Sequence, residues 1–183
     1  MTGVDSELES IINGCLNNNR LSQRQLYDKY ASKMFAVCRR YANTEAEAED
    51  MLMEGFMKVF KSLSSFEGKS AFDTWLHSVM VNTAISHYRS VRRFCNELSI
   101  SEMNDVNEAQ FASEEETITT SLDAGIVMEA LRKMPEPFRT VFNLRAVEAF
   151  SFAEIGKLLG KREKSLRVTY LRARKWLLEE LKE

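Results

Sequence analysis

The sequence has few of the residues that interrupt helices. Proline occurs only twice, at Pro135 and Pro137, and glycine seven times in 183 residues. Nothing in the N-terminal two thirds therefore breaks a helix by removing a backbone donor. Alternation of apolar and polar positions, the pattern of a half-buried strand, is also scarce. We expect an all-α fold.

Cysteine is scarce as well. Cys15, Cys38 and Cys95 form an odd, widely spaced set without a C-x-x-C pair. This pattern indicates neither a disulfide framework nor a zinc cluster. We expect buried or inert thiols, no bound metal and no cofactor.

Long apolar runs are missing too. No window approaches eighteen consecutive apolar residues, the length that would span a bilayer. Residues 1–16 carry acids where a secretion signal would need cations and an apolar block. We expect a cytoplasmic protein that does not insert into a membrane.

Groupings typical of an active site are hard to find. His77 and His87 are not accompanied by paired carboxylates at ligand spacing. Asp50 and Glu54 could form a carboxylate pair, but they have no glycine-rich phosphate loop or histidine partner. We therefore expect no catalytic residues and a protein that is not an enzyme.

Charge is present in quantity and is unevenly distributed. Residues 1–95 have a net charge of +1 and residues 124–183 a net charge of +5, whereas residues 96–123 carry eight acids and no base. This middle segment also lacks a sustained apolar period. We predict two small helical domains, 1–95 and 124–183, joined by a flexible acidic linker, 96–123. Alternatively, residues 109–122 form a helix when docked on a partner.

Three capping-box spacings precede apolar-periodic segments in the first domain. They predict helices near residues 26–41, 45–63 and 71–94, each with one apolar stripe facing a core. The capping pairs are Ser22 with Gln25, Thr44 with Glu47, and Ser70 with Asp73. The stripes are Leu26, Tyr30, Met34, Val37 and Tyr41; Leu52, Phe56, Val59, Phe60 and Leu63; and Phe72, Trp75, Leu76, Val79 and Thr83.

The third of these helices has a polar face as well. Asn82, Ser86, Arg89 and Arg93 recur at helical spacing on it. Asn and Arg suit base edges and phosphates, so this face could follow a nucleic-acid strand. A simple solvated face is the alternative. Trp75 and Tyr88 could stack on an unpaired base or belong to the core.

The C-terminal domain carries a helix-turn-helix pattern. Ser151 and Glu154 have capping-box spacing, and Gly160 then supplies a position that ends a helix and turns the chain. Residues 161–175, in the second helix, include seven Lys or Arg and one acid. Such a segment favours duplex DNA through counterion release. The alternatives are a solvated basic helix and a plain packing corner.

Taken in order, these motifs resemble bacterial RNA polymerase sigma factors of the extracytoplasmic-function (ECF) type, within the sigma-70 family. The resemblance covers roughly residues 22–95 and 126–182. The stretches that resemble the family's conserved region two are Ala48-Glu49-Asp50-Met51, Glu54, Phe56, Val59-Phe60, Phe66-Glu67-Gly68-Lys69-Ser70, Phe72, Thr74-Trp75-Leu76, Asn82-Thr83-Ala84 and Tyr88-Arg89. The stretches that resemble its region four are Leu131, Met134-Pro135, Arg139, Val141-Phe142, Leu144, Ser151, Glu154-Ile155, Leu159-Gly160, Arg172-Ala173-Arg174 and Leu177.

The resemblance implies a transcription initiation factor that binds core RNA polymerase, directs it to promoter DNA and stabilises the melted minus-10 strand. An anti-sigma factor would be a further partner. Core polymerase would dock on Asp50, Met53, Glu54 and Met57. The minus-10 strand would contact Lys69, Asn82, Ser86, Arg89 and Arg93. The minus-35 duplex would contact Arg162, Lys164, Ser165, Arg167, Thr169 and Arg172.

Some positions depart from the family pattern. Met53 stands in place of a usual glutamine and Gly55 in place of a commoner threonine, while Arg162 lies where a serine commonly caps the recognition helix. The last departure implies a poorly capped helix. Two other classes remain open. One is a conventional helix-turn-helix regulator without polymerase docking, and the other is a helical adaptor that binds no nucleic acid.

Overall fold

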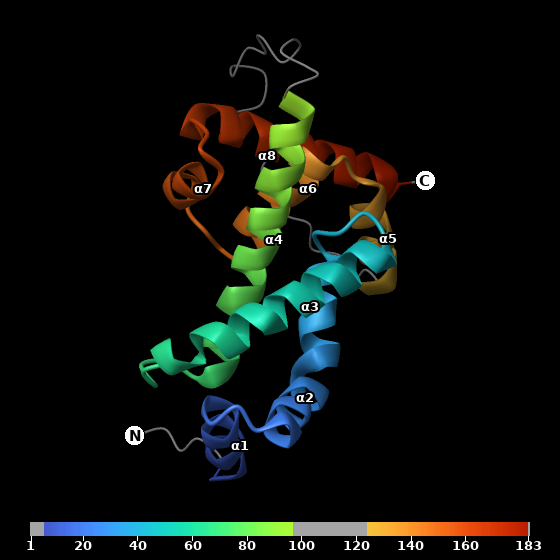
Figure 1. The fold of residues 1–183 in the computed structure, drawn as a ribbon. Coiled ribbons are helices and arrows are strands. Elements are labelled where there is room, and N and C mark those ends of the chain that lie inside the picture. Colours follow the sequence, from blue (N-terminus) through green and yellow to red (C-terminus); the bar gives the residue numbers. More distant parts are fainter. Residues whose placement is uncertain (1–5, 97–123, 183) are drawn as a thin grey trace. The chain divides into compact units, whose positions relative to one another are not determined.

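The computed structural model describes residues 6–96 and 124–182, and throughout these ranges the regular structure is helical (Figure 1). The all-α prediction is confirmed. The chain divides into two compact units, residues 1–87 and 88–183, with the division falling inside helix α4 (Phe72–Asn96). The predicted linker after Asn96, and with it the alternative helix 109–122, lies outside the described residues.

The N-terminal unit contains the three predicted helices and one more. These are α2 (Arg20–Arg39), α3 (Glu45–Ser62), followed by the 3-10 turn η1 (Leu63–Ser65), and most of α4. The additional helix is α1 (Ser6–Leu16), which packs on α2. Leu8, Ile11 and Cys15 of α1 are buried at helical spacing, so the sequence did contain the signal for it.

The helix starts only partly follow the predicted capping boxes. The Thr44 hydroxyl accepts the N–H of Glu47 at 3.1 Å, as expected for the start of α3. The Ser22 prediction is wrong, because α2 begins earlier and is capped by the Asn19 side chain, which accepts the N–H groups of Leu21 and Ser22. Asn19 is an equally good capping residue, and the spacing rule alone selected the wrong one.

Most of the predicted stripes lie in the core of this unit. The first stripe is fully buried, with Tyr41 lying just beyond the end of α2, and so are Leu52, Phe56, Val59 and Leu63 of the second and Phe72, Leu76 and Thr83 of the third. Phe60, Trp75 and Val79, which the sequence also predicts in these stripes, are only half-buried. Gly55 lets α3 and α4 approach closely, since a Cβ at this position would overlap the sulfur of the fully buried Met80. A threonine here would need Met80 to move.

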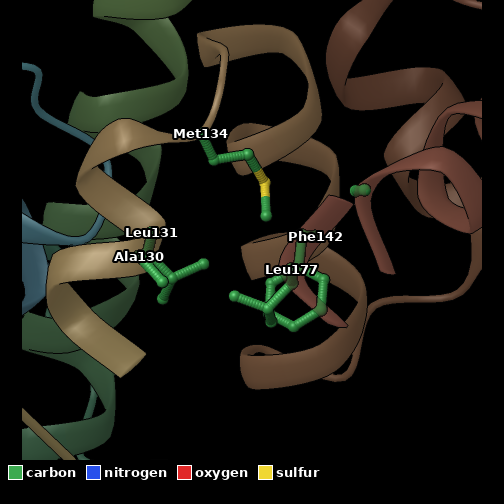
Figure 2. Close-up of a cluster of buried hydrophobic side chains, with 6 residues drawn as sticks. Ala130, Leu131, Met134, Phe142 and Leu177 are labelled. Atoms are coloured by element: carbon green, nitrogen blue, oxygen red, sulfur yellow. The ribbon is translucent and has the colours of Figure 1, made fainter. Parts of the chain in front are cut away.

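The C-terminal unit is built from α5 (Ala124–Lys133), α6 (Glu136–Phe142), the π-helical turn η3 (Asn143–Val147), α7 (Phe152–Leu159) and α8 (Glu163–Glu180). Pro135 occupies the N-cap position of α6, where the missing N–H of proline costs nothing. Figure 2 shows side chains from α5, α6 and α8 converging on one apolar cluster. Its buried members are Ala130, Leu131, Met134, Phe142, Ala173 and Leu177.

A charged side chain is also fully buried in this unit. Arg139 of α6 donates from Nη1 to the backbone carbonyl of Arg132 at 3.1 Å. Arg132 lies in the last turn of α5, where carbonyl groups have no partner within the helix. Arg139 therefore caps α5 and ties it to α6.

Candidate functional site

One face of α3 carries the residues predicted to dock on polymerase. Asp50, Met53, Glu54 and Met57 are all exposed, and their spacing places them on one side of the helix. Met53 and Met57 are each 56% exposed, although methionine is usually buried. Glu54 pairs with Lys58 at 2.7 Å. The result is a surface that combines two acids with two adaptable apolar side chains.

One face of α4 carries three of the residues predicted to contact the minus-10 strand. Asn82, Ser86 and Arg89 are exposed, and the Ser86 hydroxyl donates to the Asn82 carbonyl at 2.8 Å. Arg93 is on the same helix, but its side chain lies outside the described residues. Tyr88 is only 4% exposed, so it belongs to the core rather than to a base-stacking surface.

The loop before α4 is anchored by aromatic rings. The Phe66 ring lies 5.3 Å from Phe72 in an edge-to-face arrangement and 5.5 Å from Trp75. Such pairs stabilise beyond their buried area. Lys69, the loop residue predicted to contact DNA, is exposed and paired with Glu67. The aromatic contacts of Phe66 therefore hold this loop against the start of α4, while Lys69 stays exposed.

An ion pair orients α4 against α2. Lys33 donates to Asp73 at 2.5 Å, and the Tyr30 phenol hydrogen-bonds the same carboxylate. The bond from Lys33, helped by Tyr30, holds the pKa of Asp73 below its ordinary value. Burial and the Asp73 carboxylate raise the pKa of Tyr30. Asp73, which the sequence predicts as half of a capping box, thus pairs with side chains of the neighbouring helix α2.

Sequence reasoning missed a second link, between α4 and α3. His87 Nε2 lies 2.9 Å from Glu47 Oε1, and Glu47 Oε2 accepts the backbone N–H of Asn43 at 2.5 Å. Glu47 therefore binds both at the start of α3 and to a side chain in the second half of α4. The two residues are 40 positions apart, so no local pattern could reveal the contact.

The helix-turn-helix is formed by α7 and α8. Ser151 and Glu154 make the predicted reciprocal capping box, and Gly160 ends α7 at φ +65°. The hydrogen bonds from Ser151 lower the pKa of Glu154. Gly156, which the sequence did not single out, lies against the turn, because a Cβ there would be 2.9 Å from the Lys161 carbonyl oxygen.

The start of α8 presents the predicted minus-35 residues. Arg162, Lys164, Ser165 and Arg167 are exposed, and Arg172 is half-buried. Arg162 occupies the N-cap without a side-chain cap bond, as the departure from serine predicted. Thr169 is separate from this surface: it is 7% exposed and its hydroxyl donates to the Ser165 carbonyl at 2.8 Å.

No group of histidine, cysteine and carboxylate side chains that could hold a metal ion occurs in residues 6–96 and 124–182. Over the same ranges, none of the helices combines the length and apolarity that crossing a bilayer would require.

Comparison with known proteins places this arrangement in a family. Residues 26–94 match the family model described as Sigma-70 region 2, and residues 124–177 match Sigma-70, region 4. The chain is 29% identical over 163 residues to the ECF RNA polymerase sigma-E factor of Haemophilus influenzae, covering 83% of each chain. It is 28% identical over 152 residues to the RNA polymerase sigma-H factor of Pseudomonas aeruginosa, covering 80% of this chain and 79% of that protein.

A solved structure has the same fold. The sigma factor RpoE of Bartonella quintana, crystallised with the anti-sigma factor NepR, matches with a TM-score of 0.51 at 22% identity, covering 87% of this chain and 96% of that one. The two matching regions lie in the expected order along the sequence. The chain belongs to the sigma-70 family and is of the ECF type.

Proposed function

We infer that this chain is a transcription initiation factor that binds core RNA polymerase and directs it to specific promoters. Membership of the ECF sigma-70 family supports this function, because its relatives are named RNA polymerase sigma factors. The observation that carries it to particular residues is the exposed face of α3. There two acids and two methionines stand on a helix whose opposite side is buried.

Each predicted residue group then has a separate task. Core polymerase binds Asp50, Met53, Glu54 and Met57, where acids set the orientation and methionines adapt to the partner. Lys69, Asn82, Ser86, Arg89 and Arg93 hold the unpaired minus-10 strand. Arg162, Lys164, Ser165, Arg167 and Arg172 contact the minus-35 duplex, whereas Thr169 is buried and makes no such contact.

The remaining assignments follow from this function. The domains are 1–95 for polymerase docking and minus-10 recognition, 96–123 as the acidic linker, and 124–183 for minus-35 recognition. The protein works in the cytoplasm, where polymerase is, and it catalyses no reaction, since strand opening is driven by binding energy. An anti-sigma factor would regulate it by covering the same surfaces.

Retention of core polymerase tests the docking face. Tagged protein should retain the large polymerase subunits from a lysate, and the Asp50→Arg, Glu54→Arg double variant should lose them. The matched control reverses two exposed acids elsewhere, Glu7→Arg with Asp28→Arg on α1 and α2, and should retain them. Run-off transcription with the retained polymerase then identifies promoters. Folded protein that binds duplex DNA but never polymerase would instead be a conventional helix-turn-helix regulator.

A further inference from the structure

Two methionines of α3 differ from the other methionines that the structure describes. Met53 and Met57 are one helical turn apart, and each is 56% exposed. Four others are at most 2% exposed, and Met128 of α5 is half-buried. The four buried ones are Met34, Met51, Met80 and Met134. Met53 and Met57, the methionine pair, therefore present two thioether groups to solvent on one helix face.

A solvent-accessible thioether is open to oxidation by a peroxide. The sulfur lone pair attacks one oxygen of hydrogen peroxide, an S–O bond forms and the O–O bond breaks. The second oxygen leaves with both protons as water, so the sulfur loses two electrons and the peroxide gains them. Because hydrogen peroxide is uncharged, the exposed carboxylates of Asp50 and Glu54 do not repel it. The methionine pair is thus accessible to this oxidant.

The two cysteines that the structure describes compete poorly for the same oxidant. Cys15 is 5% exposed and Cys38 is 1% exposed. Burial raises the pKa of both thiols, that of Cys38 to about 11, so little thiolate forms near neutral pH. The thiolate is the reactive form of cysteine. Exposure therefore directs peroxide to the methionine pair in preference to these thiols.

We propose that Met53 and Met57 form a reversible oxidation site that controls the docking of core polymerase on α3. This inference rests on the proposed function. A sulfoxide places a polar S=O group where a flexible apolar side chain stood. Burying that oxygen against a surface that fits a thioether leaves it without a hydrogen-bond donor, which disfavours docking. Methionine sulfoxide reductases reverse the change: two thiols become a disulfide and the oxygen leaves as water.

Peroxide treatment of the full-length chain tests the proposal. The N-terminally labelled protein is treated with hydrogen peroxide, catalase removes the excess, and fluorescence anisotropy measures affinity for purified core polymerase. Peptide mass spectrometry should find sulfoxide at Met53 and Met57 before Met80. We expect the affinity to fall at least about tenfold and to recover after treatment with reductases for both sulfoxide epimers. Thermal unfolding should be unchanged, because the oxidised side chains are exposed.

Variants identify the sulfur atoms that are responsible. The double variant Met53→Leu, Met57→Leu forms no sulfoxide at either position, so its affinity, whatever its starting value, should be the same before and after peroxide. The matched control Met128→Leu should lose affinity on treatment as the wild type does. If the double variant binds polymerase too weakly to measure, the two single leucine variants decide, and at least one of them should lose less affinity than the wild type.

Two results would overturn the proposal. In the first, Met53 and Met57 are oxidised and the affinity for polymerase stays the same. In the second, the double variant, or both single variants in its place, lose as much affinity on treatment as the wild type. If instead the untreated, folded chain does not bind core polymerase, the docking part of the proposed function fails and this proposal with it. That failure is distinguishable, because it occurs without peroxide.

Discussion

His87 Nε2 lies 2.9 Å from Oε1 of Glu47, which connects the second half of α4 to the first turn of α3. Both side chains are largely buried, at 28% and 17% exposure. The same Glu47 accepts the Asn43 N–H, so one carboxylate fixes a helix start and the angle between two helices. These helices carry the two faces assigned to polymerase and to the minus-10 strand.

Replacing this carboxylate should destabilise the N-terminal unit. Glu47→Ala removes the acceptor for Asn43 and the partner of His87, and we expect a loss of about 1–2 kcal/mol in the free energy of unfolding. The exposed Glu49→Ala, two residues further on, is the control and should change it by less than about 0.5 kcal/mol. Urea unfolding measures both, and equal effects would contradict a structural role for the Glu47 contacts.

The Lys33–Asp73 pair predicts a specific loss of stability in acid. Its contacts hold the pKa of Asp73 below the ordinary 3.8, so the folded state binds the proton less readily than the unfolded state. The stabilisation is complete above that ordinary value and is lost as pH falls through the lower folded pKa.

Asp73→Asn should therefore reduce stability at neutral pH and flatten its dependence on pH below about pH 4. The measurement is the free energy of unfolding in urea across this range. Asp28→Asn, which alters an exposed pair with Arg24 at 3.6 Å, is the control and should follow the wild-type curve. A wild-type curve identical to that of Asp73→Asn would refute the linkage.

The capping box of α7 should matter for stability and, through it, for DNA binding. Ser151→Ala removes the acceptor for the Glu154 N–H at 3.2 Å and a bond to its carboxylate. We expect a loss of about 1 kcal/mol and weaker duplex binding, because α7 supports α8. Lys157→Ala in the same helix is the stability control. Circular dichroism melts and fluorescence anisotropy provide the two readouts, and an unchanged melting temperature would contradict the expectation.

The two glycines of the helix-turn-helix should respond differently to substitution. Gly156→Ala places a Cβ 2.9 Å from the Lys161 carbonyl oxygen, which is backbone and cannot rotate away. We expect a loss of about 1–3 kcal/mol with a displaced turn and weaker DNA binding. Gly160 has φ +65° and open space around it, so Gly160→Asn, which tolerates this conformation, should cost less. The reverse order of unfolding free energies would show that the turn is not packed this way.

Local patterns predicted the helices but placed some of their starts wrongly. The α7 capping box and the helix end at Gly160 were confirmed, because each depends only on residues within one short segment, Ser151 to Gly160. The start of α2 was missed because Asn19 and Ser22 can each cap a helix, and only the structure shows which does. Helix α1 was overlooked although Leu8, Ile11 and Cys15 already had helical spacing.

The candidate site divides in the same way. The polar face of α4 could be derived from helical periodicity, because residues four apart share a side of a helix wherever it packs. The face of α3 was implied by the resemblance to the family. Thr169 could not be separated from Ser165 by that reasoning, since burial on a helix flank depends on what packs there. The contact of Arg145 with Phe152 could not be predicted, because a cation–π contact has no characteristic spacing in the sequence.

For this protein the sequence alone determined what short-range physics controls: helical periodicity, the α7 cap and the glycine turn. Tertiary structure decided which polar groups meet across helices, namely Glu47 with His87, Lys33 with Asp73, and Arg145 with Arg167 on Phe152. Helix geometry fixes a side chain's direction relative to its own axis. Its partner depends on how whole helices pack, and that is settled by the sum of many weak contacts distributed along the chain.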